Sequence, residues 1–311
     1  MQIARDLTPG LASRATVLTI GRFDGVHLGH QQLIRTTVER ARALDMLSAV
    51  LTWEPHPRAV LQPGQPLQLL SDLDEKIEQI QRLEPDILIV APFTDEIRRL
   101  TAAEYLTRIC AALPVREIWV GEDFAMGRGR EGDIPRLMEI GREMGFAVGA
   151  LSKYTVAGIP VSSSRIRELV LAGNVAGAGA LLGRPFALRG IVARGDGRGR
   201  QIGFPTANVQ VSNDVALPAN GVYACRVRLV SGEMVPAVTN IGVRPTFDGT
   251  RRVVEAHLLD WEGDLYDQVL RVELLMRLRN ERKFSSVNEL VAQIRQDVLE
   301  ARAMLGLPNT G

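Results

Sequence analysis

The sequence predicts an α/β protein in two parts: a parallel sheet flanked by helices, then a small antiparallel β-barrel closed by a C-terminal helix. Three observations predict this fold. The 311 residues exceed the roughly 150 of one typical domain, so two domains are expected. In the first half, short β-branched runs alternate with segments of helical period, as in parallel sheets. In the second half, short strands are separated by turn residues, as in small barrels.

The first half supplies the elements of the parallel sheet in alternating order. The apolar residues between 33 and 44 recur at helical spacing, so an amphipathic helix is predicted from about 29 to 45 between two strands. Further helices are predicted at 72–83, 101–112 and 133–145, with Asp72, Thr101 and Asp133 as N-cap candidates. The predicted strands cover residues 15–21, 47–53, 86–93, 116–121 and 146–151.

The second half begins near residue 183, where Gly and Arg density replaces helical period. This boundary divides the chain into domains 1–182 and 183–311. Strands are predicted at 186–193, 221–230, 233–242, 251–261 and 268–279. A last helix is predicted at about 286–304, and its apolar stripe must dock on another element. The stripe consists of Val287, Leu290, Val291, Ile294 and Val298.

Composition narrows the class of protein. With 46% apolar and 23% charged residues, the chain has the composition of an ordinary soluble globular protein. A net charge of +1 argues against nucleic-acid binding, which usually needs a basic excess. No apolar stretch approaches the ~18 residues of a membrane span, so no membrane association and a cytoplasmic location are expected. Cys110 and Cys225 show neither metal-ligand nor redox spacing and are expected to be reduced packing residues.

The stretch GRFDGVHLGH, residues 21–30, is the strongest candidate site. It lies where the first predicted strand leads into a helix, and a helix N-terminus offers free N–H groups and a positive dipole to anions. Gly25 and Gly29 keep the backbone approachable, while His27 and His30 can aim at the same phosphate. The alternative for a single histidine here is a helix cap or a packing residue.

Two other phosphate-binding patterns are excluded. Gly127, Gly129 and Gly132 match G-x-G-x-x-G, but five residues separate Gly127 from the preceding strand and no acidic residue follows at the required distance. A mobile loop over a ligand is the better interpretation. No P-loop pattern occurs in the sequence.

The His-x-Gly-His spacing resembles the signature of the nucleotidyltransferase superfamily, which uses it during attack on the α-phosphate of a nucleoside triphosphate. VSSSRIRE resembles the second signature of that superfamily, with Ser163, Ser164 and Arg167 in matching places. Alone, this segment could equally be a helix N-cap. If the attacking group is a phosphate monoester, it is already anionic and needs no general base, so catalysis reduces to alignment and charge neutralisation.

A second candidate site lies in the barrel half. In FPTAN the proline is predicted to form a turn that presents Thr206 and Asn208 together, and their oxygens suit Mg²⁺. Period-2 alternation places Val253, Glu255, His257 and Leu259 on one strand face. Glu255 is therefore either a solvated strand residue or a general base, which the phosphorylation of an alcohol requires.

Taken together, these motifs closely resemble the bacterial bifunctional riboflavin kinase and FMN adenylyltransferase family, also called FAD synthetases. The resemblance covers nearly the whole chain. It also includes TWEPHPRAVL, VGEDF, GRGRQIGFPTAN, NIGVRPTF, VEAHLLD and LRNERKFSSVNELVAQIRQD. It implies a Rossmann-like nucleotidyltransferase domain and a barrel of the riboflavin kinase type.

The resemblance also implies the site residues and ligands. The catalytic residues would be His27, His30 and Arg167 for adenylyl transfer and Glu255 for riboflavin phosphorylation, with Thr206 and Asn208 holding Mg²⁺ and ATP as co-substrate. The small-molecule partners would be riboflavin, FMN and ATP, with FAD as product. His56, Pro57, Asp123 and Arg279 would lie near the flavin. Nucleotide and phosphate would be bound by Gly21, Phe23, Asp24, Gly25, Gly29, Ser163, Ser164, Gly203 and Pro205.

The sequence departs from the family pattern at a few positions and leaves alternatives open. Arg22, Ala125 and Met126 could alter the affinity of the transferase site for nucleotide or flavin, and Asp267 stands where a turn glycine is expected. One alternative is a nucleotidyltransferase with another phosphorylated acceptor and an accessory barrel. Another is a barrel that only binds nucleic acid or flavin. The oligomeric state stays open.

Overall fold

A computed structural model describes residues 1–195, 197–246 and 249–308. The chain divides into two compact units, and each is described by itself. The first unit contains Met1–Leu67 and Leu73–Ser162; the second contains Gln68–Asp72 and Ser163–Gly311. Residues 163–182 therefore belong structurally to the barrel unit, while the boundary near residue 183 between the two activities stays a prediction.

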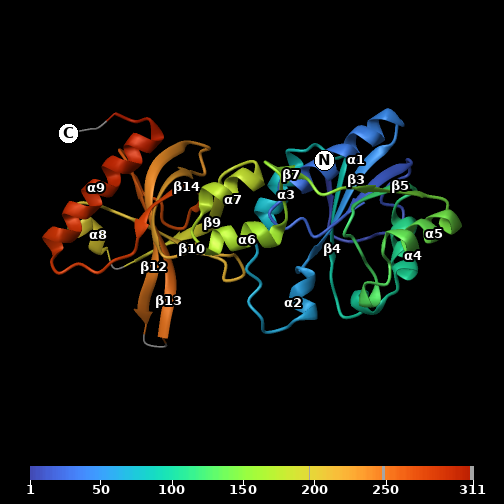
Figure 1. Cartoon of the computed structure of the whole chain (residues 1–311), viewed down its shortest axis with the longest axis horizontal. Coiled ribbons are helices and arrows are strands. Elements are labelled where there is room, and N and C mark those ends of the chain that lie inside the picture. The colour runs from blue at the N-terminus through green and yellow to red at the C-terminus, as the bar shows by residue number, and fades with distance from the viewer. Residues whose placement is uncertain (196, 247–248, 309–311) are drawn as a thin grey trace. The chain divides into compact units, whose positions relative to one another are not determined.

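The first unit is built on a six-stranded sheet in the order β1-β4-β3-β2-β5-β6 (Figure 1). Every pairing in this sheet is parallel, as the alternating sequence pattern predicts. The edge strand β1 was not predicted, because three residues are too short for a periodic pattern. The strands are β1 (Gln2–Ala4), β2 (Thr16–Ile20), β3 (Leu47–Glu54), β4 (Ile87–Pro92), β5 (Val115–Gly121) and β6 (Ala147–Leu151).

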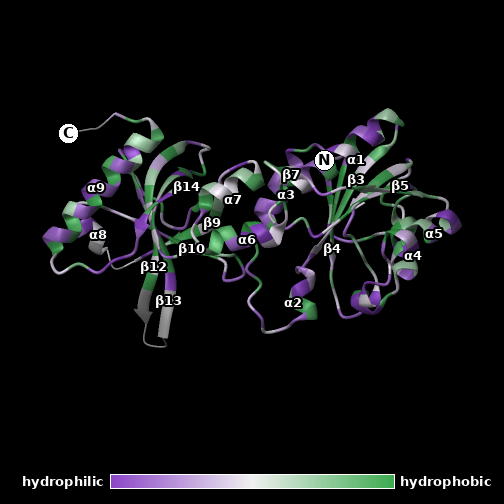
Figure 2. Ribbon diagram, viewed as in Figure 1, coloured by the Kyte–Doolittle hydropathy of each residue, from purple (hydrophilic) through white to green (hydrophobic). Residues whose placement is uncertain are grey.

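Helices cover both faces of this sheet, which makes its strands apolar on both sides. On one face, α1 (Leu28–Ala43) and α3 (Leu73–Gln81) pack against Val50 and Leu88. On the other face, α4 (Ala102–Ala112) and α5 (Ile134–Met144) pack against Leu18 and Leu51. Figure 2 shows the resulting bands of hydrophilic and hydrophobic residues on α4 and α5.

Local signals begin and end the helices where the sequence predicts. Thr101 forms a capping box with Glu104 at the start of α4, and Asp133 caps α5. Gly145 ends α5 in the left-handed conformation. The remaining elements of this unit are α2 (Pro57–Leu61), the short 3₁₀ turns η1 (Ile97–Arg99) and η2 (Arg128–Arg130), and the hairpin β7 (Thr155–Val156) and β8 (Ile159–Pro160).

The strand order reverses between β2 and β5. In open parallel sheets, ligands bind at the carboxyl ends of the strands beside such a reversal. Gly21 follows β2 and Asp123 follows β5, so the chain places two predicted site segments at this edge. The fold thus locates the first site before any side-chain chemistry is considered.

The second unit contains a closed six-stranded barrel in the order β10-β13-β12-β11-β14-β9, with antiparallel pairing throughout. The barrel and the final helix confirm the predicted fold class. One strand, β10, was not predicted, because its segment was interpreted as a turn. The strands are β9 (Phe186–Ala193), β10 (Ala207–Val211), β11 (Gly221–Arg228), β12 (Met234–Thr246), β13 (Gly249–Leu258) and β14 (Val269–Asn280).

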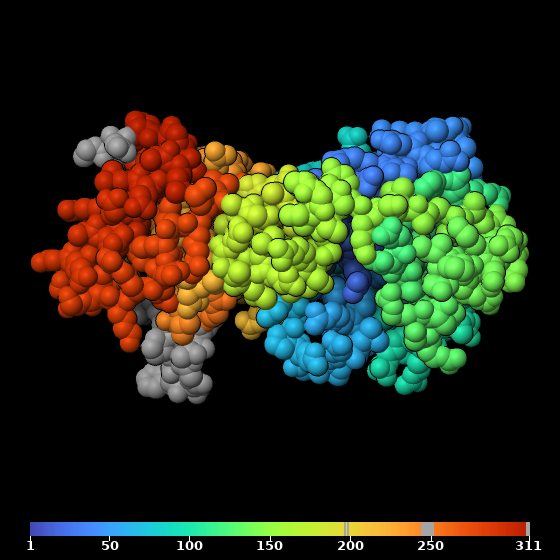
Figure 3. All heavy atoms as spheres, in the orientation of Figure 1, coloured from blue at the N-terminus to red at the C-terminus, as the bar shows by residue number. Residues whose placement is uncertain are grey.

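Within the described residues of this unit, four helices accompany the barrel: α6 (Ser163–Leu171), α7 (Val175–Leu182), α8 (Arg198–Gln201) and α9 (Val287–Leu305). In Figure 3 the red atoms of α9 lie on the visible surface of this unit. Its inner residues contact β11 and β12 through a cluster that includes Val222, Val238 and Ala301. The predicted stripe is wrong at Val287, which is 60% exposed because it is the first residue of the helix, before the contact with the barrel begins.

A buried ion pair fixes α9 to the barrel. Arg279 on β14 donates to both carboxylate oxygens of Asp297 at 2.7 Å, and Gln293 donates to the same carboxylate at 2.8 Å. The Asp297 side chain is only 2% exposed. Because the Asp297 carboxylate has lost its water, it depends on Arg279, which is 20% exposed, for compensation.

Replacing one member of this pair should therefore destabilise the second unit. We expect Asp297→Asn to lower its free energy of unfolding by about 3 kcal/mol, because the Arg279 charge stays largely buried. Arg295→Gln, at an exposed position of the same helix, should change it by less than about 0.5 kcal/mol. Urea unfolding followed by Trp261 fluorescence, in a Trp53→Phe, Trp119→Phe background, measures both. Equal stabilities of the two variants would contradict the assigned role of the pair.

Candidate functional sites

The first site lies in the turn between β2 and α1. His27 is the N-cap of α1, and its Nδ1 accepts a hydrogen bond from the backbone N–H of His30 at 3.2 Å. Since an accepting nitrogen carries no proton, the neutral form of His27 carries its proton on Nε2. The capping role and a ligand-binding role are compatible, because only one ring nitrogen is used by the helix.

The imidazoles of His27 and His30, which the sequence predicts to lie at one phosphate site, are stacked. Their ring centroids are 3.6 Å apart with an interplanar angle of 15°, and Phe23 contacts His30 edge-on at 5.2 Å. Among the described residues, His30 Nδ1 is a buried polar atom without a hydrogen-bond partner. Burial first, and then the neighbouring His27, Arg22 and Lys76, hold the pKa of His30 well below 6.5. His30 is therefore neutral at pH 7.

The backbone of this turn has an unusual conformation. Phe23 and Val26 have φ values of 49° and 39°, in the left-handed region that β-branched residues avoid. The Phe23 ring is fully buried and lies over Gly21, where a Cβ would come within 2.9 Å of it. Strained residues often occur at functional sites, held by the surrounding packing. Because its ring is buried, Phe23 could contribute to ligand binding only through its backbone, and its predicted role is untested.

A buried lysine that the sequence analysis did not select lies beside this turn. Lys76 on α3 is 4% exposed. Burial lowers its pKa, while the carboxylates of Glu54 and Asp24 act in the opposite direction. Asp24 is itself 4% exposed. The sequence gives only a weak indication that Lys76 belongs to the site. It is one of three lysines in the chain, but no local pattern shows that it lies on the buried face of its helix.

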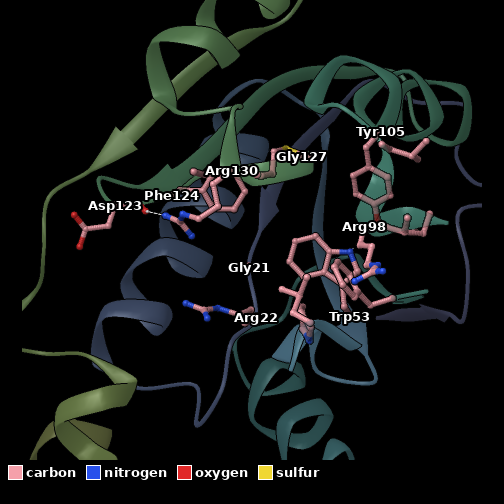
Figure 4. Close-up of a pocket in the computed structure, with 17 residues that line it drawn as sticks. Gly21, Arg22, Trp53, Arg98, Tyr105, Asp123, Phe124, Gly127 and Arg130 are labelled. Atoms are coloured by element: carbon pink, nitrogen blue, oxygen red, sulfur yellow. Dashed lines mark hydrogen bonds between the residues drawn. The ribbon is translucent and has the colours of Figure 1, made fainter. Parts of the chain in front are cut away.

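A mostly apolar pocket of about 430 Å³ opens at the carboxyl edge of the sheet (Figure 4). Residues from the ends of several strands line it, among them Gly21, Trp53, Phe93 and Asp123. The Trp53 indole donates to the Tyr105 hydroxyl at 2.9 Å, which fixes its ring at the wall. Burial raises the pKa of Tyr105 to about 12, so this phenol stays neutral. The volume suits a small organic ligand.

The predicted loop with three glycines forms part of this pocket. Gly127 and Gly129 have positive φ values and line the pocket. The Arg128 N–H donates to the Leu100 carbonyl at 2.8 Å, and Arg130 donates to the Asp123 carbonyl at 3.2 Å (Figure 4). These contacts attach the loop to the unit, and its predicted mobility is untested. The departures Arg22, Ala125 and Met126 all line the same pocket.

The remaining predicted residues of the first site fall into two groups. Pro57 and Asp123 line the apolar pocket. His56 is buried and caps α2 through Nδ1, which accepts from the Arg58 N–H at 3.2 Å. Ser163, Ser164 and Arg167 belong to α6 in the second unit, so their part in the histidine site stays a prediction.

The second site is a pocket of about 430 Å³ on the outer face of the barrel, next to α9. Five of its lining residues are cross-strand partners in one continuous row. Such partners lie side by side on one face of a sheet, about 5 Å apart. The row runs Asn208 on β10, Glu255 on β13, Asn240 on β12, Val222 on β11 and Arg279 on β14. We call these five residues the transverse row.

This row brings together residues that the sequence predicted separately. Glu255 and Asn208 are direct partners, and Thr206 lines the same pocket. Glu255 faces the pocket, whereas its neighbours Val254 and Ala256 are buried. Asn208 lies on β10 and not in a turn, because the turn ends at Thr206 and pairing with β9 and β13 begins after it. Arg279 lines the pocket, but Asp297 holds its guanidinium.

Close backbone contacts hold the segment before Asn208. Gly203 has φ 87°, and a Cβ on Gly195 would overlap the Asn208 amide. His257 Nδ1 lies 2.8 Å from the Pro205 carbonyl and must be the donor, since a carbonyl only accepts. Thr206 also borders a neighbouring pocket of about 500 Å³ that includes Trp261 and Tyr266. Two pockets of ligand size therefore meet at Thr206.

The predicted departure at Asp267 is confined to a turn. Its φ is 62°, a conformation that glycine adopts without strain. Its N–H donates to the Val192 carbonyl at 2.9 Å, so the turn is attached to β9. Asp267 does not line either barrel pocket.

Comparisons with known proteins give a family match for each half of the chain. A family model described as FAD synthetase matches residues 11–165, and one described as riboflavin kinase matches residues 182–305. The bifunctional riboflavin kinase/FMN adenylyltransferase of Escherichia coli K12 is 39% identical over 292 residues, which cover 94% of this chain and 93% of that protein. The enzyme of the same name from Bacillus subtilis 168 is 37% identical over 92% of this chain and 91% of its own length.

A solved structure of similar length also matches. The crystal structure of a Streptococcus pneumoniae protein named macrolide-efflux protein has a TM-score of 0.87 and 30% identity, covering 96% of this chain and 98% of that one. In the described part of the present chain, no helix is long and apolar enough to cross a bilayer.

The half-buried, neutral His30 generates a prediction about pH. Its pKa lies well below 6.5 in the folded protein, whereas in the unfolded chain it should be about 6.5. Between these values the unfolded chain binds more protons, so stability should fall as the pH drops below about 6.5.

We therefore expect His30→Asn to make the free energy of unfolding of the first unit less steeply dependent on pH between about 7 and about 5. Urea unfolding of a Trp261→Phe background, in which Trp53 and Trp119 report, measures the slope. An equal or steeper slope in the variant would show that His30 titrates normally in the folded protein.

Proposed function

Because this chain belongs to the bifunctional riboflavin kinase/FMN adenylyltransferase family, we propose that its two sites each carry one of the two reactions. The chain phosphorylates riboflavin to FMN with its C-terminal part. It transfers an adenylyl group from ATP to FMN with its N-terminal part, which yields FAD and pyrophosphate. The riboflavin kinase match excludes an accessory barrel. We propose residues 1–182 and 183–311 as the segments responsible.

The observation that carries the division of labour is the difference between the two sites. Glu255 stands between two amides in the barrel pocket, as expected where a hydroxyl must lose a proton before it attacks. The other site presents two stacked imidazoles at a helix N-terminus, which suits a nucleophile that already carries negative charge.

In the adenylyl transfer, a phosphate oxygen of FMN attacks the α-phosphorus of ATP. The bond to the β-phosphate oxygen breaks, and pyrophosphate leaves. We assign His27 and His30 to the phosphates, with Gly25 and Gly29 leaving the backbone accessible. A neutral His30 donates a hydrogen bond to phosphate oxygen without the cost of burying a further charge. Arg167, Ser163 and Ser164 complete this assignment as predictions from the sequence.

We assign the apolar pocket at the sheet edge to the planar rings of the reactants. Trp53, Phe93 and Phe124 offer aromatic surfaces, and most of the exposed lining of the cavity is apolar. An isoalloxazine or adenine ring stacks favourably on such surfaces. Pro57 and Asp123 retain their predicted flavin-side role within this pocket. Arg22, Ala125 and Met126 then tune its affinity.

In the kinase reaction, Glu255 accepts the proton of the terminal ribityl hydroxyl. The oxygen attacks the γ-phosphorus of ATP, and the bond to the β-phosphate oxygen breaks to release ADP. The two pockets that meet at Thr206 can hold riboflavin and ATP on either side of the transfer. The neighbouring turn with Gly203 and Pro205 then approaches the ATP phosphates.

The oxygen donors near Glu255 fit a magnesium ion. Thr206 and Asn208, which carry a hydroxyl and an amide oxygen, line the same pocket, and hard oxygen ligands are what Mg²⁺ prefers. Among the described residues no cluster of three His, Cys, Asp or Glu could hold a metal, so the phosphates of ATP would supply the remaining ligands. When bound, Mg²⁺ would neutralise charge that develops on the phosphates.

We also propose a cytoplasmic location. ATP is available there, and thiols stay reduced. Cys110 and Cys225 are both free thiols. The buried Cys225 has its pKa raised by burial to about 12, so it is not a reactive thiolate.

Separate variants of the two sites should separate the two activities. We expect Glu255→Gln to lower FMN formation at least about 100-fold, while FAD still forms from supplied FMN. We expect His27→Ala to do the reverse. Chromatography of riboflavin, FMN and FAD over time measures both reactions in one sample. Loss of both activities in either variant would contradict the division of labour.

A further inference from the structure

We propose that Asn240 binds the polyol chain of riboflavin and so determines which end of that substrate faces the phosphoryl donor. The inference rests on the proposed kinase function of the barrel pocket. Asn240 belongs to the NIG segment of β12, to which neither the sequence nor the proposed chemistry assigned a role. Its position in the transverse row carries the argument.

Asn240 lies beside the proposed base in the barrel pocket. Its cross-strand partners are Glu255 on one side and Val222 on the other. All three line the pocket. Because cross-strand partners lie about 5 Å apart on one face, the Asn240 amide is adjacent to the proposed base. Glu255 is thus flanked by an amide on each side, Asn208 and Asn240.

The Asn240 amide can still form hydrogen bonds with a ligand. Within the described residues, no side-chain hydrogen bond of Asn240 is found. Gly242, two residues further along β12, lets the Glu281 carboxylate lie close to Asn240, since a Cβ there would overlap that carboxylate and lie 3.4 Å from Asn240 Nδ2. This amide is half-buried and lines the cavity, so it can donate to and accept from a ligand without first breaking a bond within the protein.

The transverse row changes from polar at its β10 end to apolar toward β11. At the β10 end, Asn208 and the nearby Thr206 offer oxygen donors where the two pockets meet. Beyond Asn240 the row continues with the buried Val222. Val238 and the α9 residues Leu290 and Ile294 line that side of the pocket.

This polarity matches the chemistry of riboflavin, which joins a flat apolar ring system to a chain of hydroxyl groups. With the ring system against Val222 and α9, the chain extends along the row past Asn240. Its terminal hydroxyl then reaches Glu255. An amide both donates and accepts, so Asn240 can bind vicinal hydroxyls that a carboxylate could only accept from.

The test separates recognition of the chain from recognition of the rings. Asn240→Leu keeps the size of the side chain and removes its polar atoms. We expect the dissociation constant for riboflavin, from flavin fluorescence on titration, to rise about tenfold, which corresponds to about 1.4 kcal/mol. Lumiflavin carries a methyl group in place of the polyol, and its dissociation constant should stay the same.

Two outcomes would overturn the proposal: unchanged riboflavin binding, or equal weakening of riboflavin and lumiflavin. Formation of FAD from supplied FMN reports that the chain is intact, and ATP binding by the barrel reports that the second unit is folded. If Asn240→Leu does not fold, Asn240→Ser, whose shorter hydroxyl withdraws from the chain, is tested with the same expected result. Met234→Leu, at the far end of β12, is the matched control and should leave both dissociation constants unchanged.

The proposed kinase function can fail separately. If Glu255→Gln retains full FMN formation, the assignment of the base is wrong, whatever the binding data for Asn240 show. If Glu255→Gln is inactive but Asn240→Leu binds riboflavin normally, only the role of Asn240 is wrong.

Discussion

Strand register is the constraint on which both sites depend. In the first unit, parallel pairing brings the carboxyl ends of β2, β3, β4 and β5 to one edge, so residues far apart in the chain border a single pocket. In the second unit, antiparallel pairing aligns Asn208, Glu255 and Asn240 across three strands. A slip of one residue would turn every one of these side chains to the opposite face. The apolar residues that alternate with them, such as Val254 and Ala256, oppose such a slip because they would become exposed.

The histidine turn combines a structural and a chemical role in the same residues. His27 caps α1, and His30 stacks on it. If both rings were protonated, the cap would be lost and two like charges would face each other across 3.6 Å. Burial, together with His27, Arg22 and the buried Lys76, favours the neutral form of His30. The same positive surroundings attract a triphosphate. The environment that keeps the imidazole uncharged thus prepares the site for a highly charged ligand.

Most of the fold follows from local sequence patterns, whereas only part of the site geometry does. Apolar periodicity and caps such as Thr101 predict the sheet, its helices and the barrel. The reason is that the residues facing the core are apolar, and they recur with the period of the helix or strand that carries them. The strand β10 was missed because Pro205 and the polar residues after it are typical of a turn. Asn240 and Lys76 were missed for another reason. Their importance depends on pairing and packing between distant segments, and no local pattern records which residue will lie opposite Glu255 or beside His30.

The segment Gln68–Asp72 belongs to the second unit although the chain on both sides of it belongs to the first. Leu69 donates to the Asp214 carbonyl at 2.7 Å and accepts from the Ala216 N–H at 2.8 Å, and Arg167 donates to the Gln68 carbonyl at 2.7 Å. The two units are therefore connected by more than one segment of the chain. A fragment that begins at the barrel lacks the residues Gln68–Asp72 and their hydrogen bonds to the second unit. Recombination that exchanges the second unit between relatives must therefore also carry the five codons for these residues.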